Sequence, residues 1–164
     1  MSSAPLQAAN APRTTGGDSI DPCTLSASEL ARAIAQGAIT AREAVEAYIA
    51  RIEQVNGALN AVVVKRYDEA RVEADAIDQR RARGETLPPL AGVPITVKEC
   101  FDLMGTAATF GLTGRMATRA KADDPYVGRL RTAGAIVIAK TNVAQLLIYT
   151  ESDNPVYGLS LIHI

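Results

Sequence analysis

The sequence predicts an α/β domain, in which helices alternate with strands and cover a sheet. Three observations support this fold class. Residues 26–57 carry two capped helices, and a β-branched run at 61–64 follows them. Residues 94–98 alternate apolar and polar side chains, as a strand with one buried face does. Residues 123–134 carry helix start and stop signals, and the continuous apolar run at 135–139 is typical of a strand buried on both faces.

Length and composition limit the function classes. The chain has 164 residues, of which 48% are hydrophobic, and this is enough for one domain with a core. A net charge of −1 and an aromatic content of 4% disfavour nucleic-acid binding. No apolar run approaches a membrane span, and the N-terminus lacks the pattern of a secretory signal. Cys23 and Cys100 form no disulfide framework, so we expect a cytoplasmic protein.

The N-terminal part predicts a tail followed by a helix. Residues 1–22 are small and polar without periodicity, and we expect them to be disordered. Ser26 and Glu29 form a capping-box pattern at the start of the first helix, and Gly37 marks its end.

The next segment predicts a second helix, a strand and a third helix. Thr40 and Glu43 repeat the capping box, and Gly57 stops an amphipathic run. The short strand at 61–64 follows. Residues 67–83 have only a narrow apolar face, so this helix is expected on the surface, where it covers a sheet edge weakly.

The last predicted elements follow a long loop. Asp123 or Asp124 caps a helix in which Pro125 takes the first position, and Gly134 ends it before the buried strand. Val143–Leu147 has the pattern of another short helix.

Lys98 is the candidate catalytic residue. It ends the strand at 94–98, on the face opposite Ile95 and Val97, and ligand crevices form at the carboxyl ends of strands in open α/β sheets. A lysine acts as a base only when neutral, and at an unperturbed pKa of about 10.4 on the order of 0.1% is neutral at pH 7.4. The function therefore needs a dry pocket without a carboxylate partner, and Glu99 is expected to point to the other face. A solvated surface lysine is the alternative, and the spacing alone does not decide between the two.

The other motifs in the sequence indicate neither a nucleotide site nor a histidine-dependent site. Gly134–Thr141 is superficially similar to a phosphate-binding loop, but it lacks the second glycine and reads as a strand. Lys140 is therefore expected at the surface, or at the strand end where it ties down a loop. His163 is the only histidine, which leaves no histidine metal site and no Ser–His dyad. Asp153-Asn154-Pro155 predicts a turn.

Several motifs together resemble a known family. The segment LAGVPITVKECFDLMGTAATFGL, followed by DDPYVGRLRTAGAIVIAKTNVAQLLIYTESDNPVYG, is similar to the N-terminal part of the amidase signature family over about residues 24–158. The KECF segment, Gln145 and SDNPVYG are closest to the branch that contains fatty acid amide hydrolase. The resemblance implies a mixed central sheet covered by helices, and an amidase that acts on a small-molecule amide without a cofactor.

The resemblance also implies a Ser–cis-Ser–Lys triad in which Lys98 is the lysine. The neutral lysine would take a proton from a bridging serine, which activates the nucleophilic serine for attack on a carboxylic or fatty acid amide. Leu147 and Ile148 align with a segment that lines the acyl site in the fatty-acid-amide branch, and a core role is the alternative.

The end of the sequence departs from the family. The family carries both serines in a Gly-Ser-rich loop downstream of Asn154–Gly158, and we expect the chain to be truncated before it and inactive. Residues 23–158 would be the amidase portion. Leu159–Ile164 reads as an in-frame translation of a transposon-end adaptor from a sequencing library, and a genuine apolar C-terminus is the alternative.

Competing interpretations remain open from the sequence. An aminoacyl-tRNA amidotransferase A-like subunit is one, although that branch more often has an acidic residue where this chain has Gln145. A Schiff-base enzyme with Lys98 as nucleophile and a non-catalytic binding module are two others. A homodimer is an option for the full-length protein.

Overall fold

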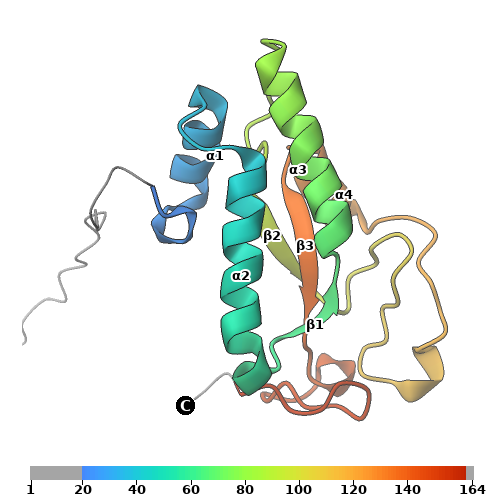
Figure 1. Ribbon diagram of the computed structural model, residues 1–164. Coiled ribbons are helices and arrows are strands. Elements are labelled where there is room, and N and C mark those ends of the chain that lie inside the picture. Colours follow the sequence, from blue (N-terminus) through green and yellow to red (C-terminus); the bar gives the residue numbers. More distant parts are fainter. Residues whose placement is uncertain (1–19, 162–164) are drawn as a thin grey trace, which may run out of the picture.

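The computed structural model describes residues 20–161. Most of the predicted N-terminal tail, together with His163, lies outside these described residues. Within them, one sheet is covered by helices, and the predicted α/β class is confirmed (Figure 1). The four α-helices of this part are α1 (Ala27–Gln36), α2 (Ala41–Leu59), α3 (Tyr67–Ala82) and α4 (Pro125–Thr132). Its three strands are β1 (Val62–Lys65), β2 (Pro94–Lys98) and β3 (Ile136–Thr141).

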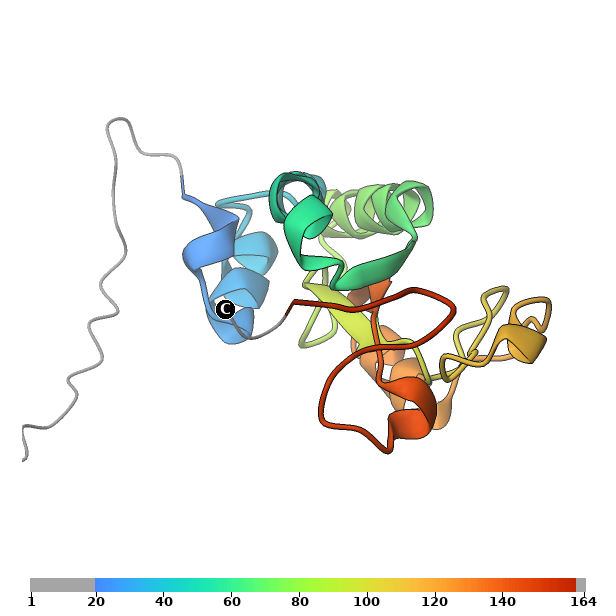
Figure 2. The same ribbon diagram turned by 90° about the horizontal axis from the view of Figure 1, so that it is seen from below.

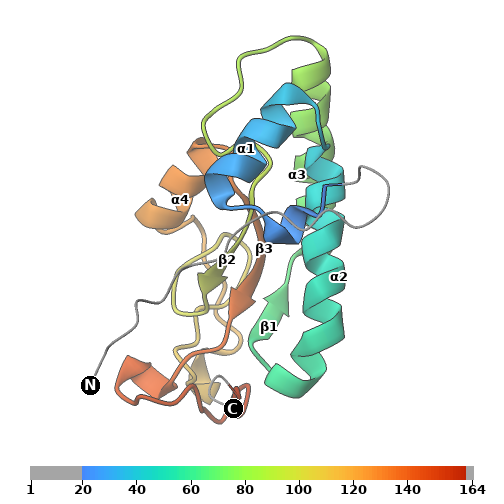
Figure 3. The same ribbon diagram turned by 90° about the vertical axis from the view of Figure 1, so that its left-hand side faces the viewer.

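The sheet is mixed, with the order β1-β3-β2. β1 runs antiparallel to β3, and β2 runs parallel to it with Lys98 opposite Thr141. The continuous apolar run of β3 therefore forms the centre of the sheet, and Ile136 to Lys140 are all buried. α2 and α3 cover one face and α4 lies on the other, as a view from the side shows (Figure 3).

Both predicted capping boxes are present. Ser26 and Thr40 each accept a hydrogen bond from the backbone N–H three residues later, and the Glu29 and Glu43 carboxylates accept from the cap residues in return. α1 ends at Gly37 as predicted. α2 passes through Gly57 and ends two residues later, because Asn60 adopts the left-handed conformation (φ 49°) that closes the helix.

α3 has a larger role than its sequence predicts. Its buried side chains are Ala70, Ala74 and Ile77, and the helix contacts both α2 and the central strand β3. The two alanines are fully buried, since their small side chains let the helix approach closely. Its opposite face is exposed, as expected.

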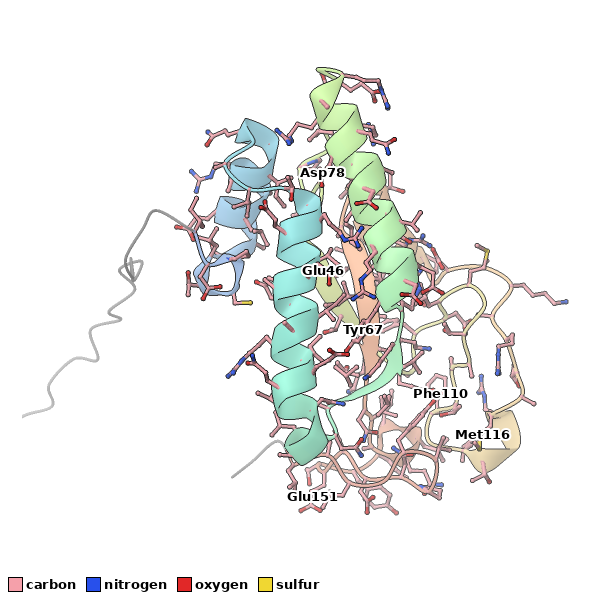
Figure 4. All side chains as sticks on the ribbon, in the orientation of Figure 1. Glu46, Tyr67, Asp78, Phe110, Met116 and Glu151 are labelled. Carbon is pink, nitrogen blue, oxygen red and sulfur yellow. The ribbon has the colours of Figure 1, made fainter. Side chains whose placement is uncertain are left out.

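Charged side chains join α3 to α2 on the outer side. Glu46 accepts hydrogen bonds from Arg42 and Arg71, and it lies between the two helices in Figure 4. Asp78 of α3 accepts from the backbone N–H groups of Ala41 and Arg42 at 2.8 and 3.0 Å. Asp78 thus supplements the N-terminal cap of α2 from a neighbouring helix.

Two apolar clusters lie on the two faces of the sheet. The larger one joins α1, α2 and α3 to β3. The smaller one consists of Val97, Leu103, Val127 and Val137. Val97 belongs to the second cluster, which fixes β2 against α4 and directs the neighbouring Lys98 outward.

Candidate functional site

The candidate site lies where β2 and β3 end. The two strands are parallel, so Lys98 and Thr141 reach the same edge of the sheet. Figure 2 looks onto this edge, where the loops after both strands gather. These are residues 99–124 between β2 and α4, and residues 142–161 after β3.

Lys98 occupies the predicted position at the carboxyl end of β2. The burial pattern of the strand alternates as expected, with Val97 buried and both Thr96 and Lys98 exposed. Phe101 donates its backbone N–H to the Lys98 carbonyl oxygen at 3.0 Å, which forms a tight turn directly after the strand. Residues 20–161 thus fix the backbone of Lys98 and leave its side chain open to solvent, so the expected dry pocket stays a prediction.

Glu99 is buried beside the exposed lysine. Glu99 is 0% exposed, in contrast to the exposed Lys98, and its predicted direction opposite to Lys98 stays a prediction. Glu99 Oε1 accepts from the backbone N–H of Thr109 at 2.7 Å and Oε2 from that of Phe110 at 3.1 Å. The Tyr157 hydroxyl group donates to Oε1 at 3.2 Å. A buried carboxylate with three donors is well satisfied.

Lys140 is also fully buried, so its predicted surface position is wrong. Its ammonium group donates to the Ala107 carbonyl oxygen and to Thr106 Oγ1, and the alternative, a strand-end residue that ties down a loop, is confirmed. Burial lowers the pKa of Lys140, and the nearby charge of Glu99 acts in the opposite direction. Lys140 in β3 and Glu99 directly after β2 thus hold the same loop, residues 105–111.

Sequence reasoning missed the loop contacts of Glu99 and the full burial of Lys140. Their partners lie 10 to 58 residues away in the chain, and no local period reveals such contacts. The available signal was a charged residue that follows a run of buried apolar side chains, as Lys140 follows Ala139.

Leu147 and Ile148 are exposed, at 42 and 69%. The predicted helix over 143–147 is wrong, because only the 3-10 turn η3 (Gln145–Leu147) forms there. Leu146 and Leu147 have positive φ angles of 53° and 61°, a left-handed conformation that leucine seldom adopts. The cause is non-local, since the Leu146 N–H donates to the Phe110 carbonyl oxygen at 2.9 Å.

The predicted turn at Asp153-Asn154-Pro155 is confirmed. Asn154 Oδ1 accepts from the backbone N–H groups of Val156 and Tyr157 at 3.0 and 2.9 Å. Its amide nitrogen donates to Asn142 Oδ1 and to the Val143 carbonyl oxygen. This buried pair of asparagines ties the last loop to the end of β3.

Two clefts flank this end of the molecule. One has a volume of about 480 Å³ and is lined mainly by Gln145 and residues 149–155. The other, of about 340 Å³, lies over the loop that Glu99 and Lys140 hold, and Tyr157 forms part of its wall. Lys98 lines neither of these two clefts. In the part of the chain that the structure describes, no three His, Cys, Asp or Glu side chains gather as a metal site requires.

A model of the amidase family matches residues 43–160 of the chain. The chain belongs to the amidase family. Among curated amidase relatives, fatty-acid amide hydrolase 2 of Homo sapiens is 41% identical over 143 residues, which cover 83% of this chain and 27% of that protein. Indoleacetamide hydrolase of Bradyrhizobium diazoefficiens is 45% identical over 136 residues, which cover 83% of this chain and 26% of that protein. The chain therefore spans little more than a quarter of the length of these relatives.

Solved structures place the chain in the same amidase fold. A bacterial aryl acylamidase of the amidase signature family has a TM-score of 0.79 at 32% identity, over 83% of this chain and 29% of that one. A fatty acid amide hydrolase structure also has a TM-score of 0.79, at 27% identity over 83% of this chain and 24% of the other. The predicted family is confirmed, and a fatty-acid amide hydrolase is among its relatives. No helix in residues 20–161 is long and apolar enough to cross a membrane.

Proposed function

We propose that this chain is the N-terminal part of an enzyme that hydrolyses amides, and that Lys98 is its base. The observation that carries the proposal is the position of Lys98 at the carboxyl end of β2, within a segment that the amidase family model matches. The chain contributes the lysine, and a serine pair would come from a part of the amidase fold that lies outside the matched segment.

The reaction would run as a proton relay. Neutral Lys98 would take a proton from a bridging serine, which takes one from the nucleophilic serine as that oxygen attacks the amide carbonyl carbon. The proton returns along the same path to the leaving amine, and water then hydrolyses the acyl-enzyme. Lys98 is exposed among residues 20–161. The remainder of the enzyme would therefore have to cover Lys98 and exclude water, which lowers the pKa of a lysine.

The proposed substrate is an amide with an apolar acyl or aryl group. Leu147, Ile148 and Tyr149 present three exposed apolar side chains in a row at the same end of the sheet as Lys98. Isolated exposed apolar residues are common, but a contiguous group favours a binding surface. Substitution of Leu147 by serine should raise KM for a decanoyl amide several-fold and leave KM for acetamide unchanged.

Replacement of Lys98 tests the proposal. In the full-length enzyme, Lys98→Met should lower kcat for a p-nitroanilide substrate by about 10²–10⁴-fold, the usual contribution of a general base. Lys121→Met is the matched control, because Lys121 is an exposed lysine in the loop before α4. Lys98→Met activity within threefold of the wild type would refute the role of Lys98.

We also propose that residues 1–164 alone are inactive. This rests on the family resemblance, in which both serines lie in a Gly-Ser-rich loop downstream of the segment that matches Asn154–Gly158, so Lys98 would lack the serine that it deprotonates. Amide hydrolysis by the purified 164-residue chain, with Lys98→Met as the blank, would contradict this. The genomic sequence beyond Gly158 provides an independent check, because a Gly-Ser-rich stretch with two serines should follow.

A further inference from the structure

Glu99 is clamped at both its backbone and its side chain. Its backbone N–H donates to the Thr141 carbonyl oxygen at 2.9 Å, which extends the pairing of β2 and β3 by one residue. Its carboxylate accepts the N–H groups of Thr109 and Phe110 and the hydroxyl group of Tyr157. Hydrogen bonds to an ionised acceptor are stronger than neutral ones, so these contacts attach the loop firmly to the end of the strand that carries Lys98.

The loop that Glu99 holds lies directly against the exposed apolar segment, residues 146–149. The Phe110 carbonyl oxygen accepts from the Leu146 N–H. The approach is close, because a Cβ atom at Gly111 would lie 3.2 Å from the Gln145 Cα atom and 2.5 Å from the Asn154 Cβ atom. The backbone on both sides of this contact is left-handed, with φ 54° at Phe110 and 53° at Leu146.

Left-handed non-glycine residues persist only where surrounding contacts hold them. Here the contacts form a continuous path from Lys98 to Glu99, from the Glu99 carboxylate to Phe110, and from Phe110 to Leu146. Glu99 is the only link of this path that is a side chain. Substitution of the Glu99 side chain therefore alters this path but leaves the side chains of Lys98 and Leu146 unchanged.

We propose that Glu99 is a positioning residue, which sets the distance between Lys98 and the apolar segment 146–149 and thereby the preference of the enzyme for amides with long acyl chains. The inference rests on the proposed function. A long acyl chain would contact the apolar segment while its amide group meets the base, so it requires the correct spacing. A short acyl chain does not reach the segment and is insensitive to that spacing.

The test compares two substrates in the full-length enzyme, decanoyl p-nitroanilide and acetyl p-nitroanilide. Glu99→Gln replaces an acceptor oxygen by an NH₂ group that faces the N–H of Thr109 or Phe110. We expect the decanoyl/acetyl ratio of kcat/KM to fall about tenfold, the size of one lost charge-assisted hydrogen bond. This ratio does not depend on how much of the enzyme is folded, so general destabilisation alone leaves it unchanged.

Two further variants make the test specific. Tyr157→Phe removes only the hydroxyl donor to Glu99, and it should lower the same ratio by about two- to threefold. If Glu99→Gln does not fold, the Tyr157→Phe ratio alone tests the positioning role of Glu99. Glu43→Gln is the matched control, because the Glu43 carboxylate also accepts a backbone N–H, that of Thr40 at 2.7 Å, but at the start of α2. Its ratio should equal that of the wild type.

The outcomes separate the two proposals. A parallel loss of both activities in Glu99→Gln, with an unchanged ratio, would show a purely structural role and overturn the positioning proposal. A wild-type enzyme that hydrolyses both amides without a preference for decanoyl would overturn it as well and leave the amidase proposal intact. A wild-type enzyme that hydrolyses neither amide would overturn both.

Discussion

Gly134 is the position where one added methyl group should disturb the sheet most. It follows α4 with φ 94°, a conformation that side chains rarely adopt. A Cβ atom there would lie 2.7 Å from Pro88 Cγ and 2.8 and 2.9 Å from the Cα and N atoms of Ala91. Two of these three neighbours are backbone atoms and cannot rotate away. The Gly134 carbonyl oxygen also accepts from the Gly92 N–H at 3.0 Å, so a shift here would reach the start of β2.

The expected loss combines two terms. The left-handed backbone costs an L-residue about 1–2 kcal/mol. Relief of the overlap with Ala91 costs about 1–3 kcal/mol more, as overpacking of a core does. Alanine also reduces the conformational entropy of the unfolded chain, and this offsets about 0.5–1 kcal/mol of the loss. Gly134→Ala should therefore lower the free energy of unfolding by about 1–4.5 kcal/mol.

Two other glycines separate these terms. Gly84 has φ 72° and open space at its Cβ position, so Gly84→Ala tests the backbone term alone, and we expect a loss of about 1 kcal/mol or less. Gly128 lies within α4 with no neighbour within 4 Å, and Gly128→Ala should stabilise the protein by about 0.5–1 kcal/mol. Urea unfolding of the full-length protein, followed by circular dichroism, gives all three values. The reasoning fails if Gly134→Ala and Gly84→Ala unfold at the same urea concentration.

Three further predictions follow from single contacts. Thr40→Ala removes the side-chain cap of α2 and should lower the free energy of unfolding by about 1 kcal/mol in the same urea assay. An unchanged free energy of unfolding would mean that Asp78 alone caps the helix. Lys140→Ala leaves the Ala107 carbonyl oxygen without its donor and should cost about 2–4 kcal/mol, and a thermal midpoint equal to that of the wild type would contradict this. Two arginines, Arg71 first, lower the pKa of Glu46 to about 2 from 4.5, so its contribution is complete above pH 4.5 and is lost as the pH falls toward 2. Because Glu46 is 40% exposed and screened by solvent, we expect no more than about 1 kcal/mol, measured as the loss of the difference between wild type and Glu46→Gln in acid.

The sequence predicted those parts of the fold that local signals specify. The capping boxes at Ser26 and Thr40 lie within four residues of chain, and both form. The unbroken apolar run before Lys140 correctly predicted a strand buried on both faces. It could not predict that Lys140 itself is buried, since that depends on acceptors in a loop 33 and 34 residues away.

The difference between local signals and contacts far apart in the chain also explains which parts of the candidate site the sequence predicts. Lys98 was found because strand alternation and position are local properties of the chain. The predicted helix at 143–147 failed, because the apolar pattern there is equally compatible with a turn that the Phe110 carbonyl oxygen stabilises from outside. For Glu99 the sequence predicts only the face to which its side chain points. Its three hydrogen-bond partners come together only when the loops after β2 and β3 fold against each other.

The order of the strands has a consequence for synthesis on the ribosome. β1 and β2 pair only with β3 among the described residues, and β3 is the last of these three strands to be made. At about 5–20 residues per second, β1 would wait roughly 4–15 s between the translation of Val62 and that of Ile136. During that interval the nascent chain carries strand edges without their partner, and an unpaired edge is a template for pairing with another chain.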